Sequence, residues 1–352
     1  MISCRTAALA LLLTTAALGS DSPRFRGLNG SGVFEGTDLP AEVGPHVNVV
    51  WKAAIPEGKS SPIVVGEKLC LTAYKGDQRL VLCFGRTSGR ELWRRQIRVD
   101  RKDQQHQLND SASLSAVTDG TNVYAFFSEY GLVSYGPDGE KRWQAPLGPF
   151  ATPFRMGASP ILVDGKLVLV ADQTKGSYIA AFDPANGEML WKTPRAGDVG
   201  AYSTPAVFSS PRGDEIVLTG QRELASYSAS TGERLWWVNG FAKLSKGSPI
   251  VHNGIVYANV RGVGEFIAPF DEWATKKDAD SDGRVTVAEA PDEAGRESLR
   301  KLDTDGDGVV SRAEYRAPLG AEAIAGGVWA VRAGGEGEVS ANVLWKYQKA
   351  LP

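Results

Sequence analysis

The sequence predicts an all-β fold built from repeated four-stranded antiparallel units, because three features recur in register along it. Apolar runs of five to seven residues follow one another in groups of four, separated by turns rich in Gly, Asp or Asn. Each group closes on a tryptophan, and most groups open on a Ser-Pro or Thr-Pro pair. Units of this kind, stacked at a period of about 45 residues, are typical of a β-propeller.

Five complete units carry the pattern. Their closing tryptophans are Trp93, Trp143, Trp191, Trp236 and Trp345. Their opening pairs are Ser61-Pro62, Ser159-Pro160, Thr204-Pro205 and Ser248-Pro249, with Ser115-Ala116 as a degenerate copy. The first four tryptophans lie 50, 48 and 45 residues apart and the last two 109 apart, which predicts an insertion of about 60 residues in the fifth unit. We expect each tryptophan on an outer strand, packed against glycine and alanine of the next sheet.

The stretch "NVVWKA", residues 48–53, is typical of the outermost strand of a further blade. Five units and one such strand do not close a ring of seven or eight blades, and an open ring leaves sheet faces exposed. We therefore expect the ring to be incomplete and the chain to be a C-terminally shortened version of a longer protein. Closure as a ring of five blades is the alternative.

Composition and the N-terminus predict an exported protein. The net charge of −2 over 352 residues does not favour a nucleic-acid surface or a polybasic membrane patch. Residues 1–19 fit a cleaved signal peptide, because their apolar run, residues 7–18, is too short to cross a bilayer. We thus expect a periplasmic or secreted chain without a transmembrane segment, with residues 20–47 forming an N-terminal extended segment.

Several motifs resemble one family. The unit "DPANGEMLW", residues 183–191, with "TSGRELW" and "STGERLW", resembles the pyrroloquinoline quinone (PQQ) type of propeller repeat. The stretches "PRFRGLNGSGV", residues 23–33, and "LGPFATPFRMGASPILVDG" resemble exported bacterial PQQ-binding-like propeller repeat proteins. The resemblance spans residues 23–345 apart from the insertion. It implies a propeller, but not an activity, since relatives include both assembly scaffolds and dehydrogenases.

The insertion interrupts the blades. We expect propeller blades over 48–265, an inserted pair of EF-hand loops over 266–320, and the rest of the fifth blade with the start of a sixth over 321–352. Two acidic loops carry the twelve-residue calcium pattern, "DADSDGRVTVAE" at residues 278–289 and "DTDGDGVVSRAE" at residues 303–314. Only 13 residues separate them, so a single helix after Pro291 is expected to serve both loops, burying Leu299 and Leu302.

The predicted Ca²⁺ ligands follow from the positions of the pattern. A hard cation takes six to eight oxygen ligands, so carboxylates are required at positions 1, 3, 5 and 12 and a backbone carbonyl at position 7. The candidate ligands are Asp278, Asp280, Asp282, Arg284 and Glu289 in the first loop, and Asp303, Asp305, Asp307, Val309 and Glu314 in the second. Gly283 and Gly308 permit the sharp turn at position 6. We expect calcium to stabilise the insertion rather than to act as a signal.

Cys70 and Cys83 face each other if residues 68–85 form a hairpin turning at Lys75 to Gln78. Directly opposed cysteines can form a disulfide in an oxidising compartment. They can also remain buried thiols that pack as small apolar side chains, which is the interpretation we favour.

Two classes of function remain. The first is an exported calcium-binding propeller that serves as a binding or assembly scaffold, with an unknown protein or polysaccharide ligand on a propeller face. The second is a PQQ-dependent dehydrogenase of alcohols or sugars. The quinoprotein dehydrogenases that the chain resembles use an active-site calcium and, in some, adjacent cysteines, whereas this chain has no adjacent pair. Catalytic and quinone-binding residues therefore stay unassigned.

Overall fold

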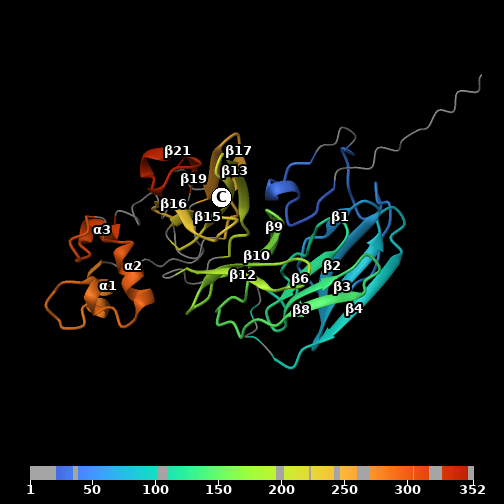
Figure 1. The fold of residues 1–352 in the computed structure, drawn as a ribbon, viewed down its shortest axis with the longest axis horizontal. Coiled ribbons are helices and arrows are strands. Elements are labelled where there is room, and N and C mark those ends of the chain that lie inside the picture. The colour runs from blue at the N-terminus through green and yellow to red at the C-terminus, as the bar shows by residue number, and fades with distance from the viewer. Residues whose placement is uncertain are drawn as a thin grey trace, which may run out of the picture.

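The computed structural model describes residues 21–34, 39–101, 103, 106, 109–195, 202–221, 223–241, 246–259, 270–303, 305–316 and 327–347. These residues form five antiparallel sheets of four consecutive strands, one of which gains a short fifth strand. Figure 1 shows the sheets following one another around the molecule, with β1–β4 and β17–β21 on opposite sides. The prediction of an all-β propeller with four-stranded blades is confirmed.

The strands fall in chain order within their blades. Blade one has β1 (Ile63–Val65), β2 (Lys68–Lys75), β3 (Gln78–Gly85) and β4 (Glu91–Arg98). Blade two has β5 (Val117–Thr118), β6 (Val123–Phe127), β7 (Gly131–Tyr135) and β8 (Lys141–Ala145). Blade three has β9 (Ile161–Val163), β10 (Lys166–Ala171), β11 (Tyr178–Phe182) and β12 (Met189–Pro194).

The last two blades differ from this plan by additions. Blade four has β13 (Ala206–Ser210), β14 (Gly213–Thr219), β15 (Glu223–Ser228) and β16 (Arg234–Asn239), and the short β20 (Gly337–Glu338) pairs in parallel with β16. Blade five has β17 (Ile250–His252), β18 (Ile255–Asn259), β19 (Val328–Arg332) and β21 (Val343–Tyr347). The insertion lies between β18 and β19, as the tryptophan spacing predicts.

The hydrophobic core lies between neighbouring blades rather than in one centre. Every residue of β6 and β7 is buried, because a blade covers each face of these strands. This double coverage explains why the inner strands are continuous apolar runs instead of alternating ones. The outer strand β12 is mostly exposed.

The closing tryptophans join one blade to the next. Trp143 donates its Nε1–H to the Pro184 carbonyl at 2.9 Å, and its ring lies against Gly187 of blade three. Trp93 and Trp191 repeat this contact on Gly139 and Gly232. The expected docking of tryptophan on glycine is confirmed at these three joints.

Trp236 departs from the expectation. Its Nε1–H donates to the Glu215 carboxylate at 2.7 Å, within its own blade, and its ring is fully buried. The turn of blade five that would receive it instead contributes β20, whose Gly337 pairs with Trp236 itself. The added strand occupies the place where a docking glycine turn would lie.

Residues 48–53 do not form a strand, so that prediction is wrong. Their extended chain still places Trp51 on blade one, where it donates to the Arg86 carbonyl at 2.8 Å and lies against Gly89. A strand assignment requires a hydrogen-bonded neighbour, and the described residues provide none beside this segment. This segment therefore keeps the contact between tryptophan and a glycine turn that joins the blades, although it forms no strand.

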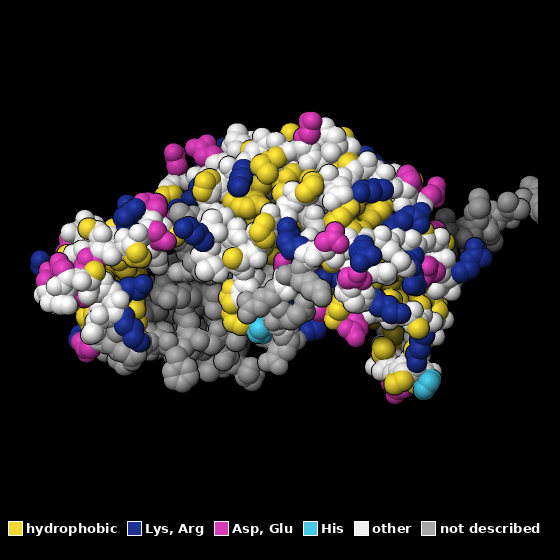
Figure 2. Space-filling view, turned by 90° about the horizontal axis from the view of Figure 1, so that it is seen from below, with side chains coloured by type: hydrophobic (Ala, Val, Ile, Leu, Met, Phe, Trp, Pro, Cys, Tyr) yellow, Lys and Arg dark blue, Asp and Glu magenta, His cyan; other side chains and the backbone are white. Residues whose placement is uncertain are grey.

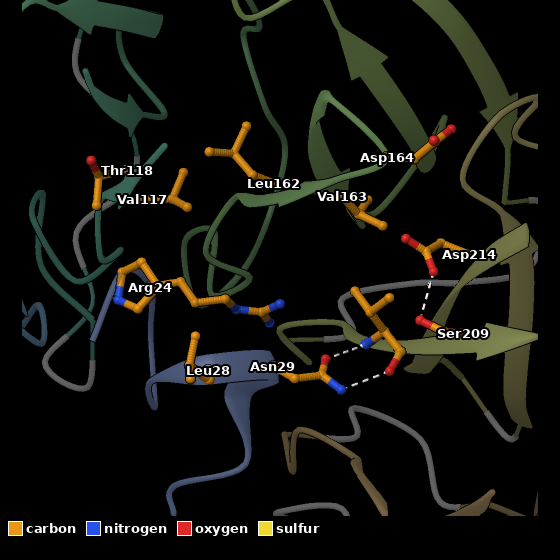
Figure 3. Close-up of a pocket in the computed structure, with 12 residues that line it drawn as sticks. Arg24, Leu28, Asn29, Val117, Thr118, Leu162, Val163, Asp164, Ser209 and Asp214 are labelled. Atoms are coloured by element: carbon orange, nitrogen blue, oxygen red, sulfur yellow. Dashed lines mark hydrogen bonds between the residues drawn. The ribbon is translucent and has the colours of Figure 1, made fainter. Parts of the chain in front are cut away.

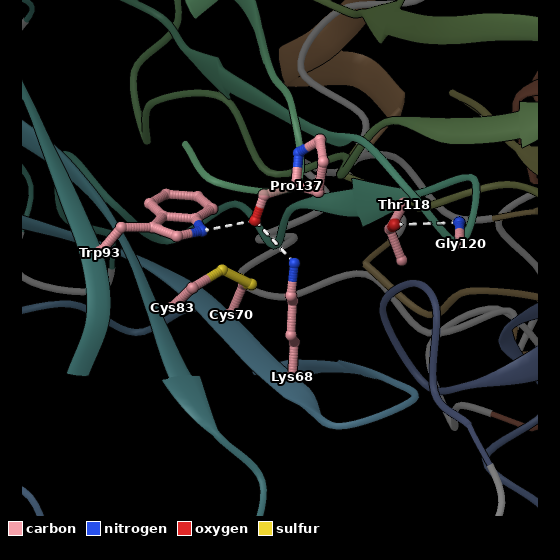
Figure 4. The surroundings of a disulfide bond; sticks show 7 residues. All are labelled: Lys68, Cys70, Cys83, Trp93, Thr118, Gly120 and Pro137. Carbon is pink, nitrogen blue, oxygen red and sulfur yellow. Dashed lines mark hydrogen bonds between the residues drawn. A yellow bond between two sulfur atoms is a disulfide. The ribbon is translucent and has the colours of Figure 1, made fainter. Parts of the chain in front are cut away.

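The hairpin prediction holds, with Cys70 opposite Cys83 on β2 and β3. The structure joins them in a disulfide, so the favoured interpretation of two free thiols is wrong. Figure 4 shows the bond beside Trp93, near the Pro137 carbonyl that accepts from both Trp93 and Lys68. The disulfide thus lies at the joint between blades one and two.

Candidate metal centre

The insertion is a compact unit of short helices. It contains α1 (Phe270–Lys277), the 3₁₀ turn η2 (Val287–Glu289), α2 (Glu293–Arg300) and α3 (Arg312–Arg316). Asp292 caps α2 by accepting from the Gly295 N–H at 2.8 Å, directly after Pro291. The prediction of one helix between the loops is therefore confirmed. Leu299 and Leu302 are buried as expected, at 5% and 2% exposure.

Each acidic loop is folded by its own first aspartate. Asp278 accepts from the Gly283 N–H at 2.8 Å, and Asp303 accepts from the Gly308 N–H at 3.0 Å. Both glycines have positive φ, +83° and +82°, a conformation that other residues rarely adopt. The two loops thus make the same turn at the same position of the pattern.

The aspartates at position 5 also make equivalent hydrogen bonds in the two loops. Asp282 accepts from the Arg284 N–H at 2.8 Å, and Asp307 accepts from the Val309 N–H at 2.7 Å. In each loop the three aspartates offer carboxylate oxygens that all lie within 4.8 Å of one another. These groups are Asp278, Asp280 and Asp282, and Asp303, Asp305 and Asp307.

The glutamate side chains at position 12 accept hydrogen bonds from backbone N–H groups near the start of their loops. Glu289 accepts from the Ala279 N–H at 2.7 Å and from the Thr286 N–H at 2.6 Å. Glu314, which is buried, accepts from the Asp305 N–H at 3.2 Å. The hydrogen bond from the Thr286 backbone, aided by others in the loop, lowers the pKa of the Glu289 carboxyl. Glu289 is accordingly ionised at neutral pH.

The two loops are bound to each other back to back. The Val310 N–H donates to the Val285 carbonyl at 2.8 Å, and Thr286 and Val309 form an isolated antiparallel bridge. Val285 and Val310 are each 1% exposed and pack with Leu299, Leu302 and Tyr315 in a cluster of their own. The two loops therefore pair through position 8 of the pattern.

The chemistry of this arrangement suits a hard divalent cation. All candidate side-chain ligands are carboxylates, four in each loop by sequence, and the structure brings three of them together in each loop. Such a cluster repels itself in the absence of a positive charge. Figure 2 shows acidic side chains gathered at the end of the molecule that the insertion forms. The two aspartate triplets could therefore hold a metal ion.

The insertion lies at the periphery of the molecule. Figure 1 shows α1, α2 and α3 at one end, beside blades four and five. Lys301 approaches Glu223 of β15 at 3.6 Å, and Gln221 donates to Ser298 at 3.4 Å. The acidic loops are thus held at the outer side of the propeller rather than among the inner strands β1, β5, β9, β13 and β17.

A series of hydroxyl groups explains why Ser or Thr recurs at the start of successive blades. The Ser61 N–H donates to Ser115 Oγ at 2.9 Å, and the Ser115 N–H donates to Ser159 Oγ at 3.0 Å. The Ser159 N–H then donates to Thr204 Oγ1 at 3.0 Å. One hydroxyl from each of blades two, three and four therefore accepts from the preceding blade, and the degenerate pair at Ser115 keeps the hydroxyl although it lacks the proline.

Sequence reasoning missed the buried charges between blades. Glu129 accepts hydrogen bonds from Arg79 and Arg155, and Arg195 forms a buried ion pair with Asp172 at 2.8 Å. No motif surrounds these residues, so only three-dimensional proximity identifies them. A quinone-binding set is not identified among the described residues, and Cys70 and Cys83 lie within blade one.

Fold and repeat together define a propeller of PQQ-like repeats with a helical insertion. Residues 47–176 and 175–292 match the family described as outer membrane protein assembly factor BamB. These matches span more than half of the chain, which therefore belongs to this family. No curated protein matches the chain. No helix in the described parts of the chain is long and apolar enough to cross a membrane.

Solved structures that match the fold share little sequence with this chain. BamB from Moraxella catarrhalis is 15% identical, with a TM-score of 0.42 over 55% of this chain and 56% of that one. A europium-containing methanol dehydrogenase is 10% identical, with a TM-score of 0.45 over 58% and 49%. Quinohemoprotein alcohol dehydrogenase from Comamonas testosteroni is 13% identical, with a TM-score of 0.42 over 60% and 39%. The chain spans between 39% and 56% of the lengths of these proteins.

Proposed function

We propose that this protein is an exported, calcium-binding β-propeller that serves as a binding or assembly scaffold, with calcium stabilising the insertion. The observation that carries the calcium part is the equivalence of the two acidic loops. Each folds around its first aspartate and brings three aspartate carboxylates within 4.8 Å of one another. Membership of the BamB family supports the scaffold part.

The proposed ligands are those predicted from the pattern. Asp278, Asp280, Asp282 and Glu289 supply side-chain oxygens in the first loop, and Asp303, Asp305, Asp307 and Glu314 in the second. The carbonyls of Arg284 and Val309 complete each set. We further propose removal of residues 1–19 on export to the periplasm or medium, and a protein or polysaccharide ligand on a propeller face.

Calorimetric titration with calcium chloride tests the metal assignment. The wild-type protein is expected to release or absorb heat on binding two ions, and the Asp278→Ala/Asp303→Ala variant is expected to lose most of it, because both position-1 ligands are gone. Asp138→Ala, in an exposed turn of blade two, is the control. Equal heats from all three proteins would remove calcium from the proposal.

The alternative is a PQQ-dependent dehydrogenase of alcohols or sugars. Reconstitution of the purified protein with the quinone, followed by dye reduction over an alcohol and sugar panel, separates the two functions. The scaffold proposal expects no quinone-dependent dye reduction. Turnover of any member of the panel would replace it with the enzyme.

A further inference from the structure

A cavity of about 450 Å³ opens where the N-terminal segment crosses the inner strands. Its lining residues are Pro23, Arg24, Leu28 and Asn29 from that segment, Val117 and Thr118 from β5, Leu162, Val163 and Asp164 from β9 and its turn, and Val207, Ser209 and Asp214 from β13 and β14. The insertion contributes none of them, so the cavity is independent of the metal centre. Neither the repeats nor the calcium pattern pointed to this place.

The N-terminal segment is held firmly across the strands. Ser22 forms a bridge with Val64 of β1, and the Thr118 N–H donates to the Pro23 carbonyl at 2.9 Å. The Asn29 side chain makes two hydrogen bonds with the backbone of Val207, at 2.7 and 2.6 Å. Figure 3 shows these two bonds at the edge of the cavity. The cavity is therefore built by contacts from several blades.

Arg24 is a buried cation in this cavity. Its exposed fraction is 5%, and it is the single basic residue among those that line the cavity. One Nη donates to the Pro205 carbonyl, while the buried Nε has no hydrogen-bond partner among the described residues. No described carboxylate forms an ion pair with it. Figure 3 shows its guanidinium reaching across the cavity between Leu162 and Asn29.

The surroundings position the guanidinium without neutralising it. A Cβ added at Gly30, where φ is +63°, would lie 3.1 Å from Arg24 Nη2, so glycine leaves the space that the side chain fills. Desolvation lowers the pKa of Arg24 to about 10, which still leaves it charged at neutral pH. A buried, charged group with an unused N–H is stabilised by any oxyanion that reaches it.

The remaining lining residues restrict what kind of anion fits. Leu28, Val117, Leu162 and Val207 give the cavity apolar walls. At the rim, the Asp164 carboxylate is paired with Lys166 at 2.6 Å, whereas the Asp214 carboxylate accepts from the Ser209 hydroxyl at 2.7 Å and forms no ion pair among the described residues. The Asp214 charge disfavours a second negative charge on the ligand.

We propose that this cavity binds a small monocarboxylate with an apolar body, whose carboxylate pairs with Arg24 and whose far end carries no negative charge. A guanidinium donates two parallel hydrogen bonds to a carboxylate or to a phosphate in the same geometry. The apolar walls and the Asp214 carboxylate favour the singly charged carboxylate over a dianionic phosphate ester. The propeller fold does not by itself predict a ligand in this cavity.

Titrations with short-chain probes test the proposal. Hexanoate is expected to bind the purified protein, as followed by amide NMR shifts and calorimetry. Hexanol lacks the charge, adipate carries a second carboxylate, and hexyl phosphate replaces the carboxylate, so all three are expected to bind more weakly. Arg24→Met is expected to weaken hexanoate binding on the order of 10-fold or more, because the ion pair is lost in a desolvated site.

Two further variants keep the outcome decisive. Leu162→Trp fills the cavity and leaves Arg24 in place, so it is also expected to abolish hexanoate binding. Arg98→Met removes an arginine whose side chain is 79% exposed in blade one, and it is expected to bind hexanoate as the wild type does. Hexanoate affinity unchanged in Arg24→Met and Leu162→Trp, or no binding to the wild type, would overturn the proposal. Tighter binding of hexyl phosphate would overturn the choice of carboxylate.

Discussion

At the scale of single residues, Glu129 shows how a buried charge can join three blades. It lies after β6 of blade two and accepts from Arg79 Nη2 of β3 at 2.8 Å, and from Arg155 in the connection to blade three. Its side chain is fully buried. Burial alone would raise the pKa of its carboxyl, but the hydrogen bonds and charges of Arg79 and Arg155 outweigh burial and hold the pKa below its usual value.

Glu129→Gln is expected to destabilise the protein by about 3 kcal/mol or more, because it leaves two arginines buried without their anion. Urea unfolding at pH 7 measures the change. Glu91→Gln is the control, since Glu91 and Arg94 are 37% and 35% exposed and such a surface pair contributes at most about 1 kcal/mol. Similar losses in both variants would contradict the role given to Glu129.

The lowered pKa also predicts a pH dependence. The ionised carboxyl contributes stability that is fully present above the unfolded pKa of about 4.3 and is lost as pH falls through the lower folded value. The difference in unfolding free energy between wild type and Glu129→Gln is therefore expected to shrink below about pH 4. A constant difference from pH 7 to pH 3 would show that folding does not lower the pKa of the Glu129 carboxyl.

At the scale of elements, the joint between blades depends on glycine turns that receive tryptophan rings. A Cβ at Gly187 would lie 2.6 Å from the Trp143 ring, and φ at this glycine is +80°. Gly165, in the turn between β9 and β10 of the same blade, also has a positive φ of +66° but has open space around it. Alanine substitutions at Gly187 and Gly165 therefore separate the cost of backbone strain from the cost of losing the contact with the tryptophan ring.

Gly187→Ala is therefore expected to cost more stability than Gly165→Ala. Gly165→Ala adds backbone strain alone and is expected to cost about 1 kcal/mol of stability. Gly187→Ala also displaces the Trp143 ring, which is expected to cost a further 1–3 kcal/mol or so. Urea unfolding, with tryptophan fluorescence as the probe, measures both. Equal costs would mean that the ring moves aside freely and that the joint does not depend on this contact.

The elements also show how far the sequence determines the fold. The spacing of Trp93, Trp143 and Trp191 predicts blades and joints, because the same contact recurs at each. Trp236 breaks the rule, since its environment depends on β20, which lies about 100 residues further along the chain. The oxidation state of Cys70 and Cys83 could not be predicted either, because the same strand register is compatible with a disulfide and with two packed thiols. Repetition is predictable, whereas exceptions depend on distant segments.

At the scale of the whole molecule, propeller and insertion have separate cores. Clusters of buried residues join each pair of neighbouring blades, whereas Val285, Leu299, Leu302, Val310 and Tyr315 form a cluster within the insertion. The sequence predicts this division, because the alternation of apolar runs stops where the acidic loops begin. The position of Arg24 could not be predicted, since the N-terminal segment has no repeat that reports which strands it crosses.

If the loops hold calcium as proposed, its removal is expected to loosen the insertion and to leave the blades folded. Without an ion, the three clustered aspartate carboxylates of each loop repel one another, while the inter-blade cores contain none of these groups. Hydrogen exchange with EGTA present is expected to accelerate at the amides of residues 278–314, with β2 and β3 staying protected. The Asp278→Ala/Asp303→Ala variant should exchange rapidly there with or without calcium. Equal acceleration in the blades would mean that the metal centre stabilises the propeller as one cooperative unit.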